Sequence, residues 1–283
     1  MDINRLDSRF GAEVTGLDLS RPLDSVTRSR VNDLFVDNVV LCFRGQSFDR
    51  PEAFIRAAEN LGRPMAPVTA TWRLAGFDVI EELTNHATDR RRGGNAPLMR
   101  GGSWHTDHSN LEAPPKATVL YAIDVPAAGG NTEFTNLFLA YDALDDATKA
   151  MIRGRRVFHA YLSRRAPRKL LARTKEEERG SSGCWQPLVR RHPESGRSAL
   201  YLNPMRCDEV EGMDRAEGDA LLDRLYAHCD QPRFQYSHRW RPGDVLIWDN
   251  RSALHQATFD FDRSERRYLH RIMLRGDRPL LAV

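Results

Sequence analysis

A short polar stretch, "WHTDHS" at residues 104–109, carries side chains that can bind a metal ion. On a β-strand alternate side chains point to the same face, so His105 and Asp107 would share a face while Thr106 and His108 point away. One histidine and one carboxylate on a common face supply two ligands of a two-His, one-carboxylate site, which holds non-haem Fe(II) and leaves coordination positions open. A solvated polar turn is the alternative interpretation of this stretch.

The third ligand must come from distant sequence. The candidate histidines are His159, His192, His228, His238, His255 and His270. We favour His255, because it follows the apolar segment "DVLIWDN" and a tight turn, at the point where another strand begins. The residues therefore predict a metal site made of His105, Asp107 and His255.

Arginines with strand spacing follow this histidine. Arg267 and Arg271 are four residues apart and would share one face of a strand, whereas Arg266 lies on the other face. An inward guanidinium close to a metal site is suited to bidentate binding of a carboxylate. A set of solvated surface charges is the alternative for such a run.

The elements that must position these side chains are short strands with a few helices. The pattern predicts strands at 12–19, 39–43, 78–85, 116–125 and 131–136, helices at 27–38, 50–62, 138–154 (one or a pair) and 217–229, a hairpin over 186–203, and two or three strands over 239–277. This order predicts a mainly β fold with decorating helices, a double-stranded β-helix (jelly roll), as a single domain over 1–283. Residues 155–186 are expected to be irregular, and 153–179 to form either a lid or a solvated loop.

The composition narrows the class of protein. The 283 residues carry a net charge of +3, with 41% hydrophobic and 29% charged residues, which is an ordinary globular balance. No dense basic run is interleaved with aromatic residues, so we expect no nucleic-acid partner. The acidic, polar start is not a signal peptide, no stretch reaches the roughly 20 apolar residues of a membrane span, and the four cysteines form no paired framework. A cytoplasmic protein with no membrane partner is predicted.

Several motifs together resemble a known family. "WHTD", "GGNTEF", "AYDAL", "WDNRSALHQA" and "RRYLHRIMLRGD", with "GAEVTGLDLSRPL" and "NVVLCFRGQSF" earlier, are similar to the taurine dioxygenase and aryloxyacetate dioxygenase family of Fe(II)- and 2-oxoglutarate-dependent dioxygenases. The resemblance covers essentially the whole chain. It implies the jelly roll, an Fe(II) ion, 2-oxoglutarate as co-substrate, and O₂.

The resemblance also implies a role for each matching residue. His105, Asp107 and His255 match the iron ligands, and Thr132 and Arg267 match the pair that binds the distal carboxylate of 2-oxoglutarate. The segment before the arginines is one residue longer than in the taurine enzyme, so Arg266 is a rival for Arg267. Arg271 matches an arginine that meets the anionic end of the primary substrate. A small anionic substrate and a homo-oligomer are therefore expected.

The implied reaction is hydroxylation of an unactivated C–H bond, with 2-oxoglutarate converted to succinate and CO₂. A hydroxylated carbon that bears O, N or S would then lose that group, so cleavage is the second possible outcome. "RGGSW" has glycines where the taurine enzyme has a substrate-binding Asn, so taurine itself is not expected. Desaturation or cyclisation on the same scaffold, a zinc hydrolase and a non-catalytic metal-binding jelly roll are the alternatives.

Overall fold

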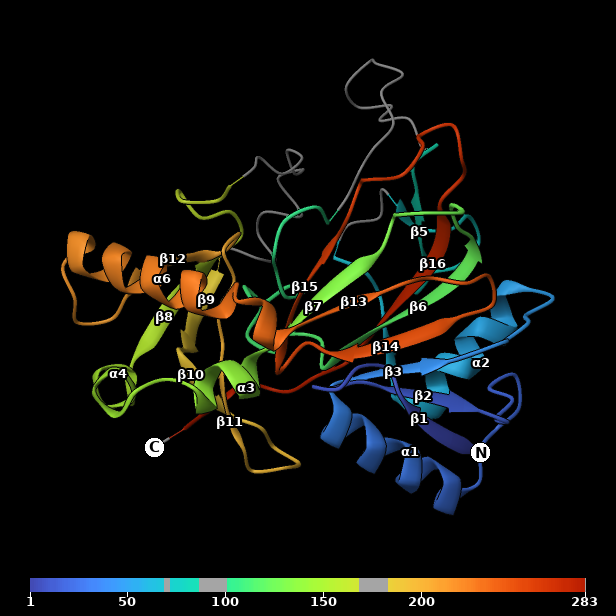
Figure 1. Cartoon of the computed structure of the whole chain (residues 1–283), viewed down its shortest axis with the longest axis horizontal. Helices are drawn as coiled ribbons and strands as arrows, with labels where there is room; N and C mark the ends of the chain where they lie inside the picture. Colours follow the sequence, from blue (N-terminus) through green and yellow to red (C-terminus); the bar gives the residue numbers. More distant parts are fainter. Residues whose placement is uncertain (69–71, 87–100, 168–182, 283) are drawn as a thin grey trace.

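An eight-stranded sheet forms the frame of the molecule. Most of its strands are labelled in Figure 1. The computed structural model describes residues 1–68, 72–86, 101–167 and 183–282. The sheet runs in the order β1-β2-β3-β14-β6-β16-β4, with β5 also paired to β16. All pairs are antiparallel except β2 with β3. Its strands are β1 (Asp2–Arg5), β2 (Ala12–Thr15), β3 (Val40–Phe43), β4 (Pro64–Met65), β5 (Glu81–Thr84), β6 (Ala117–Asp124), β14 (Val245–Asp249) and β16 (Tyr268–Leu274).

Three smaller sheets accompany the eight-stranded sheet among the described residues. The one that matters for function has the order β13-β7-β15, with β13 (Gln235–His238), β7 (Thr132–Asn136) and β15 (Ala253–Ala257). The others are β12-β8-β9, from Cys207–Val210, Arg156–Ala160 and Gly183–Pro187, and β11-β10-β17, from Ser198–Leu200, Val189–Arg191 and Leu280–Leu281.

The large sheet has two buried faces, and the strand period of two separates them. In β14, Leu246 and Trp248 belong to a core cluster that also contains Phe134 of β7, so this face packs against the β13-β7-β15 sheet. Val245 and Ile247 belong to the other cluster, beneath the helices. Because both faces are buried, β14 reads as the continuous apolar run "VLIW" and not as an alternating pattern.

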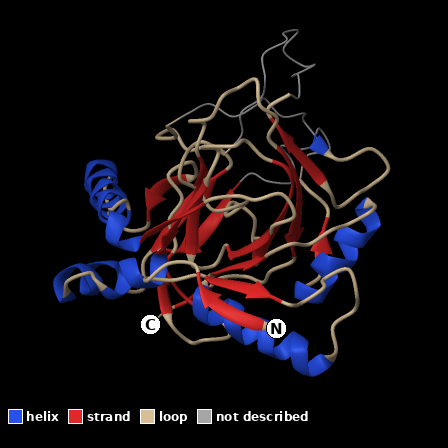
Figure 2. Ribbon diagram, turned by 45° about the vertical axis from the view of Figure 1, so that its right-hand side comes forward, coloured by secondary structure: helices blue, strands red, loops and turns tan. Residues whose placement is uncertain are grey.

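Helices α1 (Ser25–Asn38) and α2 (Pro51–Leu61) cover the outer face of the large sheet (Figures 1 and 2). The carboxylate of Asp24 accepts a hydrogen bond from the Thr27 N–H and caps α1, whereas α2 begins at Pro51, where a missing N–H costs nothing. Phe35 of α1 and Phe54 of α2 are buried in the outer cluster. No helix among the described residues is long and apolar enough to cross a membrane.

The other helices in the described part of the chain lie around the smaller sheets. They are α3 (Leu137–Asp142), α4 (Asp146–Ile152), α6 (Arg215–Cys229) and the 3₁₀ helix η3 (Pro232–Phe234). The predicted helix over 138–154 is the pair α3 and α4, and the hairpin predicted over 186–203 contains the antiparallel pair β10 and β11.

Two predictions from the sequence need correction. Residues 155–186 are not irregular throughout, because 156–160 and 183–187 form the paired strands β8 and β9. These strands have the sequences RVFHA and GCWQP. The many arginines of the region suggested an irregular chain and made these short strands hard to recognise in the sequence. The strand predicted over 78–85 is shorter, from Glu81 to Thr84. Residues 168–182 of the expected lid segment lie outside the described residues.

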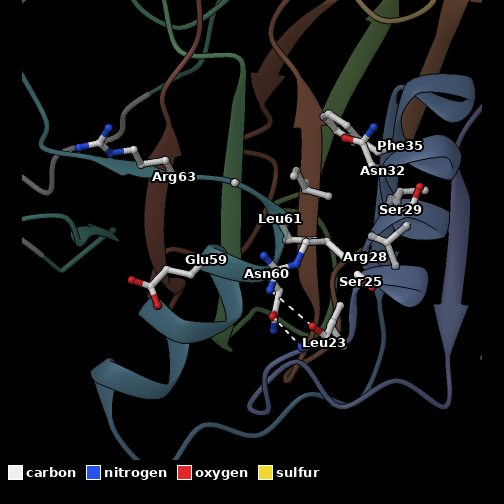
Figure 3. A pocket seen from close by; sticks show the side chains of 14 residues that line it. Leu23, Ser25, Arg28, Ser29, Asn32, Phe35, Glu59, Asn60, Leu61 and Arg63 are labelled. Atoms are coloured by element: carbon white, nitrogen blue, oxygen red, sulfur yellow. Dashed lines mark hydrogen bonds between the residues drawn. The ribbon is translucent and has the colours of Figure 1, made fainter.

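A cavity of about 850 Å³ lies between α1 and α2. Figure 3 shows Asn60 of α2 in it, with its amide oxygen accepting a hydrogen bond from the Leu23 N–H. Leu41 and Ile247 line the cavity, and both point to the outer face of the large sheet. The cavity is therefore separated by the sheet from the residues predicted to bind metal.

The packing of α2 predicts a large loss of stability for Phe54→Ala. Phe54 is fully buried, so the substitution should lower the free energy of unfolding by about 3 to 5 kcal/mol through lost transfer energy and a residual cavity. Urea denaturation measures the change. The control Val26→Ala, at a position that is 77% exposed on α1, should stay within about 0.5 kcal/mol of the wild type. Equal effects of the two substitutions would contradict the described packing.

Candidate metal centre

An isolated antiparallel β-bridge joins the two histidines of the predicted metal site, His105 and His255. The His105 N–H donates to the His255 carbonyl at 3.0 Å, and the His255 N–H donates to the His105 carbonyl at 2.8 Å. Residues that exchange both backbone bonds lie directly opposite each other with side chains on the same face. The two imidazole rings accordingly face each other, with centroids 4.2 Å apart.

Asp107 completes this group from a turn and not from a continuing strand. His105 makes only an isolated bridge, and the chain turns at residues 107–110, where His108 adopts a φ of 44°. Asp107 Oδ1 lies 3.9 Å from His105 Nε2, and Oδ2 lies 3.8 Å from His255 Nε2. Between the two ligands, the Thr106 hydroxyl donates to the Asn250 carbonyl at 2.8 Å.

The protonation states suit a cation. Burial opposes ionisation of Asp107, but the charges of Arg271, His255 and His105 outweigh it and hold the pKa of this carboxyl far below its usual range. Burial, with the neighbouring His105, lowers the pKa of His255 well below its usual value, so that its imidazole is neutral. A carboxylate and a neutral imidazole are the forms that bind metal.

The two rings are oriented by different means. The Nδ1 of His105 lies 2.7 Å from the Ser103 carbonyl, so Nδ1 carries the proton and Nε2 presents its lone pair to the site. His255 is held by ring packing, with centroids 4.6 Å from Trp248 and 6.4 Å from Phe134. The ligand atoms of His105, Asp107 and His255 all lie within 4.8 Å of one another. This donor set fits a divalent transition metal with open positions.

A chain of hydrogen bonds from the "WDN" segment holds the carboxylate. Trp248 Nε1 donates to Asn250 Oδ1, Asn250 Nδ2 donates to Thr118 Oγ1, and Thr118 Oγ1 donates to Asp107 Oδ2 at 2.6 Å. Thr118 and Trp248 are directly opposite each other on β6 and β14, so both point to the inner face of the large sheet. Thr118 could not be singled out from the sequence, where it is one polar residue near the start of the mainly apolar strand β6.

Thr132 and Arg267 lie beside the metal ligands. Thr132 pairs with Ala257 and Phe134 pairs with His255, so the side chain of Thr132 points to the same face as that of His255. Its hydroxyl accepts a hydrogen bond from Trp240 Nε1 at 3.0 Å and keeps its own proton to donate. Arg267 Nε donates to the Gly130 carbonyl at 2.9 Å, two residues from Thr132.

Of the two candidate arginines, Arg267, which the sequence favours, is buried, and Arg266 is not. Arg267 is 8% exposed, and among the described residues no carboxylate lies within 4.0 Å of its guanidinium. Burial alone lowers the pKa of Arg267 to about 10. Arg266 is exposed, and its guanidinium lies over the ring of Tyr268. A buried cation without an anion in the described part of the chain is a fitting place for a carboxylate ligand.

Arg271 lies in the site but already has partners. Its Nε donates to Glu81 Oε2 at 2.8 Å, its Nη2 donates to the same oxygen, and its Nη1 lies 3.5 Å from Asp107 Oδ1. Burial disfavours its charge, but Glu81 and Asp107 outweigh this and raise the pKa of Arg271. Glu81 is a second residue that the sequence analysis missed, because "VIEELTN" reads as a strand with two ordinary surface acids.

The glycines before His105 have a packing role. A Cβ on Gly102 would meet the ring of Phe259 at 2.3 Å, and Gly101 has a φ of 83°. The glycines in "RGGSW" therefore allow close approach to the segment after β15. They leave no side chain there that could bind a substrate.

A second group with metal-binding residue types is Cys42, His238 and Asp244, whose ligand atoms also lie within 4.8 Å of one another. All three residues are buried, and the guanidinium of Arg44 donates to Asp244 Oδ2. Arg44 therefore already neutralises this carboxylate. In the first group the side chain of His105 is 17% exposed, which leaves a route to the site. We assign the candidate metal centre to the first group.

The contact between Thr118 and Asp107 predicts weaker metal binding for Thr118→Val. Hydrogen bonds to ligating groups typically contribute tenfold to a hundredfold in metal affinity, so the dissociation constant should rise by about that factor. Competitive titration of Fe(II) or Mn(II) into the metal-free protein measures it. Thr118→Ser keeps the hydroxyl and should bind metal nearly as the wild type does; equal weakening in both variants would point to packing and not to the hydrogen bond.

Comparison with known proteins relates this chain to one family. Residues 2–273 match the model of the family "Taurine catabolism dioxygenase TauD, TfdA family". The alpha-ketoglutarate-dependent 2,4-dichlorophenoxyacetate dioxygenase of Cupriavidus pinatubonensis is 33% identical over 95% of each chain. The alpha-ketoglutarate-dependent sulfate ester dioxygenase of Pseudomonas putida is 31% identical over 99% of this chain and 91% of its own.

The solved structures agree with the sequence comparisons. The crystal structure of AAD-2 in complex with Mn(II) and N-oxalylglycine has a TM-score of 0.81 and 31% identity to this chain, over 98% of both. The predicted jelly-roll fold and the resemblance seen in the motifs are thereby confirmed. The chain belongs to the TauD/TfdA family and is an alpha-ketoglutarate-dependent dioxygenase.

Proposed function

We propose that His105, Asp107 and His255 hold one Fe(II) ion. The observation that carries the proposal is the convergence of two imidazoles and one ionised carboxylate, whose ligand atoms lie within 4.8 Å of one another. One of these imidazoles, that of His105, is partly exposed. Two nitrogens and one oxygen on one side of the ion are typical of non-haem iron oxygenases. The Mn(II) named for the AAD-2 structure supports a divalent ion in this family.

We propose that Thr132 and Arg267 bind the distal carboxylate of 2-oxoglutarate. Arg267 would supply the cation, and its burial would strengthen the ion pair, because the guanidinium has no carboxylate partner among the described residues. Thr132 would donate its hydroxyl proton, since Trp240 already donates to its oxygen. The N-oxalylglycine in the AAD-2 structure is a dicarboxylate of the same length, which supports this type of ligand.

The reaction would be hydroxylation of a C–H bond in a small molecule. Bound Fe(II), with O₂ and 2-oxoglutarate, supplies oxidative decarboxylation to succinate and CO₂ together with an oxidant for the C–H bond. The residues of this chain would orient and shield the reaction. Thr118 fixes the Asp107 carboxylate, and Trp248 and Phe134 pack against His255 and exclude water from that side. If the hydroxylated carbon bears O, N or S, the product would lose that group.

The charge of the substrate is a separate matter. The acid and the sulfate ester named for the relatives favour an anionic substrate for this chain as well. The sequence analysis assigned the anion to Arg271, but Arg271 is already bound to Glu81. We therefore propose a small-molecule substrate. Any anionic group of this substrate would bind away from Arg271, because Glu81 already binds that guanidinium.

The arginine assignment gives a test with a matched control. Anaerobic titration of Fe(II) and 2-oxoglutarate into the metal-free protein should produce the weak visible charge-transfer band of the chelate. His255→Ala should abolish the band. Arg267→Met should raise the 2-oxoglutarate concentration at half-saturation by about tenfold to a hundredfold, because a charge-assisted contact is lost. Arg266→Met, which removes an exposed charge at the adjacent position, should leave this concentration nearly unchanged.

Two results would contradict the proposal. The absence of a band in well-folded wild-type protein would exclude an Fe(II)·2-oxoglutarate complex at this site. A larger effect of Arg266→Met than of Arg267→Met would transfer the co-substrate role to the exposed arginine.

A further inference from the structure

Glu81 and Arg271 are cross-strand neighbours on the inner face of the large sheet. β5 pairs with β16 so that Glu81 lies directly opposite Arg271, and side chains in such a pair point the same way. Arg271 in turn lies opposite Leu120 of β6, which belongs to the core cluster between the sheets. Sheet register therefore places the Glu81 carboxylate on the face that carries the metal centre. The contact does not depend on a loop.

The ion pair is buried and uses most of the donors that an incoming anion would need. Arg271 Nε and Nη2 both donate to Glu81 Oε2, while Nη1 lies 3.5 Å from Asp107. The side chain of Glu81 is 2% exposed and that of Arg271 is 11% exposed. A substrate anion would have to displace a carboxylate that the sheet holds in register and that has little access to water. Separating this buried carboxylate from the guanidinium of Arg271 would carry a large penalty.

Four charged side chains at the centre balance one another without the substrate. Asp107 and Glu81 carry negative formal charges, and Arg271 and Arg267 carry positive ones. A divalent ion and the dianion of 2-oxoglutarate would cancel each other, so these four side chains with the two ligands would be neutral together. Without Glu81 one positive charge would remain, located on Arg271 beside the metal. That remaining charge is what a site built for a carboxylate or sulfonate requires.

We propose that Glu81 determines the substrate class of this dioxygenase by cancelling the charge of Arg271. The part of the substrate that meets Arg271 is then an uncharged hydrogen-bond acceptor, such as an amide, ester or lactone carbonyl or a hydroxyl. A carboxylate, sulfonate or sulfate is disfavoured at this position. The inference rests on the proposed function, because it assigns a substrate to the same metal centre.

The pair itself is tested by a double-substitution cycle. Glu81→Gln, Arg271→Met and the double variant are compared with wild type by their thermal midpoints. Removal of one partner leaves a buried charge, so each single variant should be destabilised, and the double variant should lose less than the two single losses together. Additive losses would show that the two side chains do not interact in solution and would overturn the proposal. This measurement requires no substrate.

The substrate class is tested with two probes of the same shape, phenoxyacetate and its neutral amide, phenoxyacetamide. Each is titrated anaerobically into the Fe(II)·2-oxoglutarate complex, and the shift of the charge-transfer band gives its dissociation constant. Wild type should bind the amide at least as tightly as the acid. Glu81→Gln should tighten binding of phenoxyacetate by at least about tenfold and leave that of the amide within about threefold, because only the acid gains a charge-assisted contact.

Glu82→Gln is the matched control. Glu82 is the next residue of β5, points to the opposite face, and accepts a hydrogen bond from the Tyr268 hydroxyl. The substitution Glu82→Gln removes the same formal charge as Glu81→Gln does. It therefore separates a local effect at Arg271 from a change in the net charge of the chain. Its preference between the two probes should equal that of wild type.

The outcomes are distinguishable from failure of the proposed function. Without a charge-transfer band, the proposed function itself fails. With a normal band, tighter binding of the acid than of the amide by wild type overturns the inference. An unchanged preference in Glu81→Gln overturns it as well. If neither probe shifts the band of wild type or of Glu81→Gln, the expected gain in acid binding is absent and the inference is overturned.

Discussion

The two backbone hydrogen bonds between His105 and His255 are the interaction on which the metal centre depends. They bring together residues that are far apart in the sequence and set both imidazoles on one face with centroids 4.2 Å apart. Since residues of an antiparallel pair must face the same way, the bridge orients both rings at once. The turn after His105 then needs only to return Asp107 to the same side, and the φ of 44° at His108 is part of that reversal.

Around this bridge, the large sheet supplies what the ligands themselves cannot. Its inner face carries Thr118, which holds Asp107, and Trp248, which packs against His255. Both side chains lie on strands whose opposite face is buried beneath α1 and α2. The large sheet therefore has a hydrophobic core on each of its faces, and this packing holds in place the side chains that contact the metal ligands. Preorganised sites require such support from the surrounding residues.

Charge organises the same space in a second way. Arg267 is buried without a carboxylate partner in the described part of the chain, whereas Arg271, four residues later, is bound by Glu81 and approached by Asp107. Two arginines that are only four residues apart thus have opposite electrostatic environments. The first is suited to the carboxylate of a co-substrate, and the second has lost most of its attraction for an anion.

Much of this could be predicted from residue types and order. The spacing of His105 and Asp107, the strand that leads to His255, the helix bounded by Pro51 and Gly62, and the resemblance carried by "GGNTEF" and "WDNR" indicated the jelly roll, the dioxygenase class and the candidate ligands. These features are visible in the sequence because they depend on local periodicity, on turn chemistry and on residue types with few substitutes.

The tertiary structure alone decided which distant residues meet these ligands. Thr118 and Glu81 gave no distinctive local signal, because a threonine or a glutamate in a strand is ordinary until the partner strand and its register are known. Register placed Thr118 beside Asp107, Glu81 opposite Arg271, and β8 and β9 in a region whose many arginines suggested irregular chain. The sequence by itself therefore determined the fold class and the chemistry of the centre. The balance of charge around the centre was decided by strand pairing, which is a long-range property of the folded chain.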